Sequence, residues 1–391
     1  MPSAFISRSP IYDRKLETYG YELRLFGAAW ASSSISLSNL AQHIELSRLA
    51  GSHPVLIRPR LEELEALGRL PWPHGQIVVA LSSDSLSGTG APAPVVAELI
   101  ASGFAFAIDE PSSVADLPFT DGVSLCTVTA SHLDRWHNDT TVGRRQPAPK
   151  LLTRELENAR QYEESIKLGF DLFQGEFFEK PRLMRGRDLA ANRLQTLQLL
   201  ARLQDPDISI EEVTILVKQD LTLSYKLLRM LNSAFFGIPK QVESISRAVV
   251  FFGLQRIKNW ATVLLVNAAE FQPREMLITA MIRARMCERL AAAANRSNPE
   301  RYYLAGLFSL LDSIMDAPIE TILNSLGLAS EIDEALLTGG GPVGEVLRTV
   351  LDFERGRPDF HSGIVAADDT LLQQAYLDAL DWAHATCRHL G

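Results

Sequence analysis

The segment from Leu221 to Glu270 most constrains the fold, because it is dense in apolar residues at helical spacing and contains no catalytic motif. One stripe recurs at three- and four-residue steps and therefore lies on one face of a helix: Leu223, Leu227, Met230, Leu231 and Ala234. Gly237 and Pro239 are expected to end this helix. The pattern predicts a helical region that works by contact.

Two further helices are expected in the same segment. Ser244 can cap the second helix by accepting a backbone N–H hydrogen bond, and Gly253 can end it in a left-handed conformation. The third helix has an expected inward face of Ile257, Trp260, Ala261, Leu264 and Leu265, and an expected solvent face of Gln255, Arg256, Lys258 and Asn259. Three helices within about 50 residues, joined by short turns, must pack against one another.

Composition limits the class of protein. A chain of 391 residues favours two domains of roughly 180 to 200 residues each. The formal net charge of −9 argues against a nucleic-acid partner, which would require many basic contacts to phosphate. The N-terminus lacks the apolar run of a signal peptide, and charges interrupt the long apolar stretches elsewhere. The three cysteines, Cys126, Cys287 and Cys387, have no metal-binding spacing. We therefore expect a cytoplasmic protein without membrane association.

The N-terminal half alternates short apolar runs with helical patterns, which favours a parallel α/β barrel. Seven runs are candidate strands: TYGYELRLF, HPVLIRP, GQIVVALSS, FAFAIDE, DGVSLCTV, PKLLTREL and FDLFQGEFF. Since a complete eight-fold barrel usually needs about 250 residues, a shortened or incomplete TIM-like barrel is expected. A proline and several arginines in 181–193 suggest a linker, so the expected domains are 1–184 and 185–391.

Several motifs resemble known bacterial signalling domains. SRSPIYDRKLETYGYELRLF, FAFAIDE and LGFDLFQGEFFEKP resemble the EAL domain, a barrel phosphodiesterase fold that hydrolyses cyclic di-GMP. LLRMLNSAFFG, SISRAVVFFGLQRIKNWA and AGLFSLLDSIMDAPIETIL resemble the all-helical HDOD domain over roughly 189–385. The resemblance implies an α/β plus all-α fold, in which an EAL-like barrel precedes an HDOD domain.

The resemblance also identifies candidate site residues. Five positions that match the functional positions of EAL domains keep a carboxylate or amide side chain, and we take them as a remnant ligand-binding site: Glu22, Asp109, Glu110, Glu157 and Gln174. Gly175 completes the closing motif.

Other positions depart from the family pattern. Arg24 and Phe26 replace a leucine and a phosphate-binding arginine, and Arg58 replaces a metal-binding asparagine. Two glutamates of one strand are replaced by Ala80 and Ser83. The lysine of another strand is replaced by Ser124, and a glutamate of a third strand by Arg154. Because a divalent cation prefers roughly six oxygen ligands, we expect no metal, no cofactor and no phosphodiesterase activity. Two uses of the surviving acids remain open: ion pairs with Arg24, Arg58 or Arg154, or a nucleotide site whose arginines contact phosphate.

The helical half lacks the histidines that related HD phosphohydrolases use to bind metal. No histidine lies between His137 and His361, and Asp312 has none beside it. The three glycines at 339–341 follow a helical pattern and predict a turn, whereas Cys287 is expected to be a packed thiol. Residues 368–389 predict an amphipathic helix that either docks on the bundle or forms a homodimer or partner surface.

These observations favour a non-enzymatic signal-transduction adaptor that acts through contacts with other signalling proteins. The first alternative is a cyclic di-GMP receptor that binds nucleotide without hydrolysing it. A residual cyclic di-GMP phosphodiesterase comes third, and a nucleic-acid regulator comes fourth.

Overall fold

The computed structural model describes residues 4–27, 31–32, 36–82, 93–111, 122–136, 148–179, 191–232, 242, 244–267, 273–357 and 369–388. The chain forms two compact units, one of Met1–Phe178 with Asp352–Phe360, and one of Glu179–Leu351 with His361–Gly391. The expected boundary after residue 184 lies outside the described residues. The segment Asp352–Phe360 groups with the first unit, although its position in the sequence assigns it to the helical domain.

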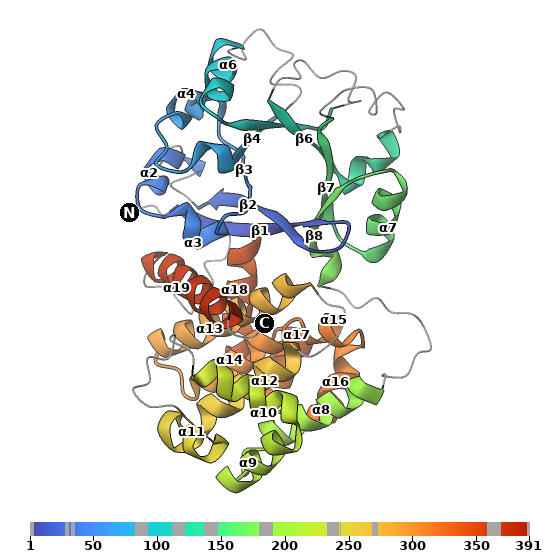
Figure 1. The fold of residues 1–391 in the computed structure, drawn as a ribbon, viewed down its shortest axis with the longest axis vertical. Helices are drawn as coiled ribbons and strands as arrows, with labels where there is room; N and C mark the ends of the chain where they lie inside the picture. Colours follow the sequence, from blue (N-terminus) through green and yellow to red (C-terminus); the bar gives the residue numbers. More distant parts are fainter. Residues whose placement is uncertain are drawn as a thin grey trace. The chain divides into compact units, whose positions relative to one another are not determined.

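The first unit contains a closed barrel of eight strands in the order β1 to β8 (Figure 1). The strands are β1 Phe5–Asp13, β2 Thr18–Phe26, β3 Val55–Ile57, β4 Ile77–Ser82, β5 Ala105–Asp109, β6 Val123–Thr129, β7 Lys150–Leu156 and β8 Leu172–Gly175. Neighbours from β2 to β8 are parallel, whereas β1 is antiparallel to both β2 and β8.

The expected α/β barrel is confirmed, and it is shortened, because all eight strands lie between Phe5 and Gly175. The count of seven strands and the alternative of an incomplete barrel were wrong. The eighth strand is β1, whose sequence FISRSPIYD carries the charged Arg8 and the proline Pro10 among largely buried residues. These residues hide the strand pattern, since proline and charge are rare inside strands. Pro10 is tolerated because the hairpin partner and the barrel supply the remaining hydrogen bonds of this strand.

Short helices flank the barrel strands. They are α2 Leu37–Ala41, α3 Leu46–Ala50, α4 Leu64–Leu67, α6 Ala93–Ala101 and α7 Ala159–Lys167, with the 3₁₀ turns η1 Leu61–Glu63, η2 His74–Gln76, η4 Ala130–Arg135 and η6 Glu176–Phe178. Residues 37–50 form two short helices, α2 and α3, with a break between them. At the break, the carbonyl of Ile44 accepts a hydrogen bond from Trp72 Nε1 at 2.8 Å.

The barrel interior explains where the polar residues lie. Its centre is filled by eight buried side chains: Ile11, Leu56, Val78, Ala80, Ala107, Leu125, Leu152 and Leu172. Because side chains alternate along an extended chain, residues two positions further on share the inward face. On the parallel strands β3 to β8, polar residues occupy most of these positions: Arg58, Ser82, Asp109, Thr127, Arg154 and Gln174. The sequence therefore places an apolar layer in the centre of the barrel and a polar layer at the carboxyl ends of the strands.

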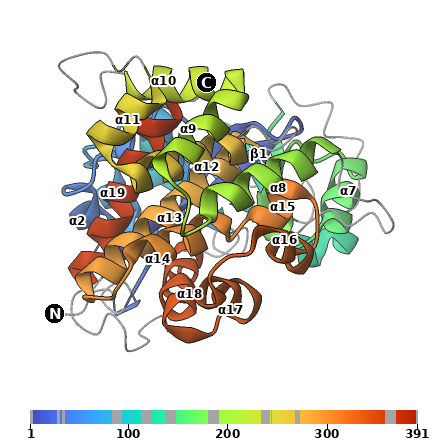
Figure 2. The same ribbon diagram turned by 90° about the horizontal axis from the view of Figure 1, so that it is seen from below.

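The second unit is all-helical, as expected (Figures 1 and 2). Its helices are α8 Ala191–Gln204, α9 Ile210–Gln219, α10 Leu221–Leu231, α11 Ile245–Phe252, α12 Leu254–Asn267, α13 Arg274–Ala293, α14 Pro299–Phe308, α15 Leu311–Met315, α16 Ile319–Leu326, α17 Ser330–Thr338, α18 Gly341–Arg355 and α19 Asp369–Arg388. Residues Asp352–Arg355 at the end of α18 group with the first unit.

The three helices expected in Leu221–Glu270 are confirmed as α10, α11 and α12, which pack together (Figure 2). The Ser244 side chain caps α11 by accepting from Arg247 N, and Gly253 follows that helix with φ +87°. The predicted inward residues are buried where the structure describes them. Ala234, Gly237 and Pro239 lie outside the described residues.

Lys258 contradicts its expected place on the solvent face of α12. It is only 6 % exposed, and its Nζ donates to the carbonyl of Asp205 at 3.1 Å. Burial lowers the pKa of this ammonium group, while Asp205 opposes the shift. The helical pattern missed it because a long aliphatic stem can pack in a core while its charged end reaches a carbonyl.

The C-terminal helix α19 packs against α13. Cys387 Sγ lies 3.7 Å from Met281 Sδ, and Arg289 forms an ion pair with Asp378. Docking on the bundle is therefore confirmed, whereas a dimer surface stays a prediction. Cys287 is buried, as expected. In the part of the chain that the structure describes, no helix is both long and apolar enough to cross a membrane.

Candidate functional site

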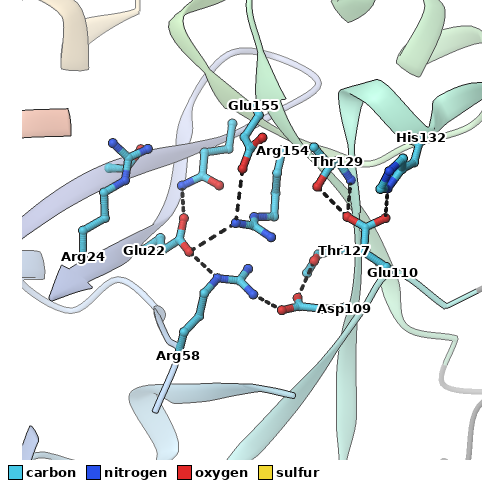
Figure 3. Close-up of polar contacts among 12 residues, drawn as sticks. Glu22, Arg24, Arg58, Asp109, Glu110, Thr127, Thr129, His132, Arg154 and Glu155 are labelled. Carbon is cyan, nitrogen blue, oxygen red and sulfur yellow. Dashed lines mark hydrogen bonds and ion pairs between the residues drawn. The ribbon is translucent and has the colours of Figure 1, made fainter. Parts of the chain in front are cut away.

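The candidate site lies at the carboxyl ends of the barrel strands, where charged side chains from different strands face one another (Figure 3). Glu22 comes from β2, Asp109 from the end of β5 and Gln174 from β8. Arg58 follows β3 directly, and Arg154 belongs to β7. Three of the five predicted site residues are thus brought together, with two arginines between and beside them.

Arg58 bridges the two acids at the centre of this network. Its Nε donates to Glu22 Oε1 at 2.5 Å, and its Nη1 donates to Asp109 Oδ2. The other oxygen of Asp109 accepts from Thr127 Oγ1 at 2.6 Å. Both carboxylates therefore already have a cationic partner, supplied by the chain itself.

Glu22 is held as an anion despite its burial. It is 5 % exposed, accepts from Gln174 Nε2 at 2.6 Å and has Arg154 Nη2 at 3.8 Å. Burial alone raises the pKa of this carboxyl, but Arg58 and Arg154 outweigh it and lower the pKa to about 2. The predicted pairing of the surviving acids with Arg58 and Arg154 is confirmed. Arg24 instead donates to Ser9 Oγ at 3.2 Å and to the carbonyl of Glu354 at 3.4 Å.

Glu110 turns away from its neighbour Asp109. It has a positive φ of 52°, and its carboxylate accepts from Thr129 N at 2.8 Å, from Thr129 Oγ1 at 2.5 Å and from His132 Nδ1 at 3.0 Å. Burial raises the pKa of Glu110, but these hydrogen bonds outweigh it and lower the pKa. The two adjacent acids therefore serve separate networks.

Glu157 lies outside this network, in contrast to its prediction as a site residue. Its side chain is exposed just before α7, and its backbone N–H donates to Gln161 Oε1 at 2.8 Å. Glu155 lies nearer the site instead, with Oε1 3.8 Å from Arg154 Nη2. The pairing of β7 with β8 shifts register between Thr153 and Leu156, and Glu155 has a φ of 58°. Such an irregularity changes which side chains face inward, and sequence alternation does not reveal it.

These residues do not fit the pair of divalent metal ions that an EAL phosphodiesterase uses. The Arg58 guanidinium lies between the two carboxylates that would have to bind cations, and like charges in that space repel. Ala80 is part of the apolar barrel core, and the Ser124 hydroxyl donates to the carbonyl of Phe106 at 3.3 Å. Ser83 lies outside the described residues. Among the residues that the structure describes, no three His, Cys, Asp or Glu side chains are grouped so that they could hold a metal ion.

A pocket of about 410 Å³ opens beside the network. Its cationic lining residues are Arg24, Arg154, Arg355 and Arg357, and its other lining residues are Glu22, Glu155, Gln174 and Glu176. Arg355 and Arg357 were missed by sequence reasoning, because they lie in the segment Asp352–Phe360, far from every barrel motif. No local signal in the sequence could have joined them to the barrel.

The second unit carries a separate polar cluster near the predicted Asp312. Burial raises the pKa of Asp312, although hydrogen bonds from Ser313 oppose the shift. Arg283, nearly fully buried, donates to Glu179 Oε1 at 2.7 Å and to Ser309 Oγ at 3.4 Å. This cluster is held by the internal ion pair between Arg283 and Glu179.

The fold agrees with the sequence expectation of a closed α/β barrel followed by a helical unit. Residues 194–315 match the HDOD domain family. The barrel region is similar in structure to BlrP1 from Klebsiella pneumoniae, which was solved in a complex with manganese and cyclic di-GMP. The two chains are 14 % identical with a TM-score of 0.38, and the match covers 46 % of this chain and 58 % of BlrP1.

Two sequence relatives extend the comparison. The chain is 33 % identical over 239 residues to the uncharacterized protein YuxH of Bacillus subtilis. The aligned region covers 60 % of this chain and only 58 % of YuxH. The chain is also 28 % identical over 375 residues to the cyclic di-GMP phosphodiesterase CdgJ of Vibrio cholerae. This aligned region covers 90 % of the chain and 84 % of CdgJ.

Proposed function

We propose that this chain is a non-enzymatic signal-transduction adaptor whose barrel does not hydrolyse phosphodiesters. The observation that carries the proposal is the position of Arg58, which donates to both Glu22 and Asp109. Hydrolysis of a phosphodiester with the help of two metal ions requires those carboxylates to bind cations. An arginine in that place supplies charge to the acids without activating a water molecule.

A signalling role is supported by the HDOD match and by the relative CdgJ, whose name places it in cyclic di-GMP metabolism. The name of CdgJ also supports the opposing proposal, that this chain is a phosphodiesterase. We favour the adaptor because Arg58, Ala80, Ser124 and Arg154 stand where the family pattern has metal ligands and a catalytic lysine. The protein would then act in a bacterial cyclic di-GMP network by binding other proteins.

The contact surface that we propose lies on α11 of the helical unit. Val250 is 83 % exposed and Phe251 is 60 % exposed, whereas residues of this size are usually covered. The net charge of −9 supports a protein partner over a nucleic acid.

Affinity capture of the tagged full-length chain from its own cells, with quantitative mass spectrometry, tests this proposal. We expect a specific signalling protein that the double variant Val250→Ser with Phe251→Ser no longer captures. Leu337→Ser, which changes another side chain of 46 % exposure on α17, is the matched control and should retain the partner. Capture that is equal for all three proteins would contradict the α11 surface, and no specific partner would contradict the adaptor.

The second candidate function is a cyclic di-GMP receptor, which the arginine-lined pocket favours. Arginine binds phosphate oxygens through paired hydrogen bonds, and this binding does not require a metal ion. Calorimetric titration with cyclic di-GMP, with and without magnesium, tests it. Micromolar binding that does not depend on magnesium would support the receptor, and no heat of binding at these concentrations would exclude it.

A further inference from the structure

We infer that the segment Asp352–Arg357 forms part of the barrel mouth and completes a pocket that binds a phosphate group. Arg24 is the principal hydrogen-bond donor of this pocket. The inference rests on the receptor function proposed above, and it deepens that function by naming the chain segment on which binding depends. It also accounts for the loss of the family's phosphate-binding arginine at Phe26.

The segment is anchored by an aromatic cluster. Phe353 is fully buried, with its ring centroid 5.3 Å from that of Phe26 and 5.8 Å from that of Phe5, in edge-to-face arrangements. Phe5 and Phe26 stack on each other at 5.4 Å. Aromatic pairs at such distances add about 0.5–1.5 kcal/mol each beyond the area they bury. Phe26 thus contributes a docking surface where the family has a ligand-binding arginine.

The end of α18 is shaped to present two arginines. Gly356 has φ +66°, its N–H donates to the carbonyl of Phe353 at 3.1 Å, and the N–H of Arg357 donates to the carbonyl of Asp352 at 3.0 Å. This pair of bonds is a Schellman motif, in which glycine accepts the left-handed conformation without steric cost. The motif fixes the backbone at Arg355 and Arg357, and both side chains line the pocket.

Polar contacts hold the segment in register with the barrel. The carbonyl of Glu354 accepts from Ser7 Oγ at 3.2 Å and from Arg24 Nη1 at 3.4 Å. Arg355 donates to both oxygens of Glu176, from Nε at 2.7 Å and from Nη2 at 3.1 Å. A bidentate pair of this kind restricts orientation as well as supplying energy. Arg24 is therefore in direct contact with the segment that completes its pocket.

The charges of the pocket favour an anion. Its four arginines and three glutamates leave one net positive charge. Arg355 is matched by Glu176, Arg357 by Asp352 and Arg154 by Glu22 and Glu155. The hydrogen bonds of Arg24 go to a hydroxyl and a carbonyl, both neutral.

One residue that lines the pocket has a buried donor without an acceptor. Within the described part of the chain, this donor is Arg154 Nε. Buried N–H groups are rarely left without an acceptor, because the loss of hydration costs about 1–3 kcal/mol. A phosphate group offers several acceptor oxygens and a charge that matches the excess in the pocket. The chemical class is thus a phosphate ester or a pyrophosphate.

The test is calorimetric titration of the full-length chain with two probes, inorganic pyrophosphate and cyclic di-GMP. Arg24→Gln should weaken binding at least about tenfold, since it removes the charged guanidinium donor and keeps a polar side chain. Phe353→Ala should weaken binding by a similar factor although it removes no ligand donor. Glu176→Gln releases Arg355 and removes one negative charge from the pocket without touching the aromatic anchor, so it should strengthen binding of both anions, and it is a second variant in case Phe353→Ala does not fold. Arg301→Gln removes an equivalent charge from an exposed ion pair with Glu331 and is the matched control.

The outcomes separate this inference from the receptor function. If pyrophosphate binds in a manner that depends on Arg24 and Phe353 while cyclic di-GMP does not bind, the pocket stands and the receptor function fails. If cyclic di-GMP binds equally to the wild type, Phe353→Ala and Glu176→Gln, the receptor stands and the role of the segment is overturned. If neither probe binds the wild type, both proposals fail.

Discussion

The guanidinium of Arg58 donates from Nε to Oε1 of Glu22 at 2.5 Å in the mouth of the barrel. Arg58 reaches Asp109 through Nη1 from the same position. One side chain thus satisfies two carboxylates that the EAL pattern reserves for metal ions. The stability and the chemistry of the barrel both depend on this relationship.

Loss of Arg58 should destabilise the barrel. In Arg58→Met, Glu22 keeps only Gln174 and the more distant Arg154, and Asp109 keeps Thr127. Breaking a buried ion pair on one side typically costs about 3–5 kcal/mol. We therefore expect a clear fall in the urea midpoint. Arg301→Met, at an exposed pair with Glu331, should change the free energy of unfolding by about 1 kcal/mol or less. Equal effects of the two substitutions would contradict the bridging role.

Glu22 should make the free energy of unfolding of the barrel depend on pH in the acidic range. Its folded-state pKa of about 2 lies below the ordinary value of 4.5, so its stabilising contribution is complete above about pH 4.5 and is lost as the pH falls toward 2. The shift corresponds to about 3 kcal/mol. Urea unfolding at about pH 7 and about pH 3 should show a larger loss for the wild type than for Glu22→Gln, which does not titrate. Parallel losses in the two proteins would show that Glu22 is not held as an anion.

Much of this arrangement follows from the sequence, and the failures have specific physical causes. Glu22, Asp109 and Gln174 were predicted at the site because they match functional positions of the EAL domain that the motifs resemble, and Arg58 and Arg154 were predicted as partners from their motif positions. Strand β1 was missed because Pro10 and Arg8 break its apolar run. Glu157 was predicted from its match to a family position, and the register shift between Thr153 and Leu156, which places Glu155 nearer the site, is not visible in the sequence. Arg355 and Arg357 could not be found, because no sequence pattern tells where a segment will dock in three dimensions.

Gly175 should tolerate no side chain. It pairs with Leu156 across β7 and β8, and a Cβ atom built on it would overlap the Leu156 backbone. Gly175→Ala is therefore expected to cost at least about 2 kcal/mol of unfolding free energy through backbone strain. Gly68→Ala is the matched control, because Gly68 has a helical φ of −61° and open space around it. Thermal melts in which both variants match the wild type would contradict the close approach of the two strands.

Ser244 should stabilise the helical unit through its cap on α11. Its hydroxyl accepts from Arg247 N at 3.3 Å, and Ser244→Ala removes this capping acceptor. We expect a loss of about 1 kcal/mol in chemical denaturation. Ser244→Asp retains an acceptor and should stay near the wild type. If the aspartate variant lost as much stability as the alanine variant, the capping interaction would not account for the effect.

The most direct test of the account is hydrolysis itself. Purified full-length protein is incubated with cyclic di-GMP and either magnesium or manganese, and the linear dinucleotide is measured against a Glu22→Ala blank. Because Arg58 takes the place of a cation between Glu22 and Asp109, we predict no product above the blank with either metal. Linear dinucleotide that forms with the wild type and disappears in Glu22→Ala would contradict the central claim that this barrel is not a phosphodiesterase.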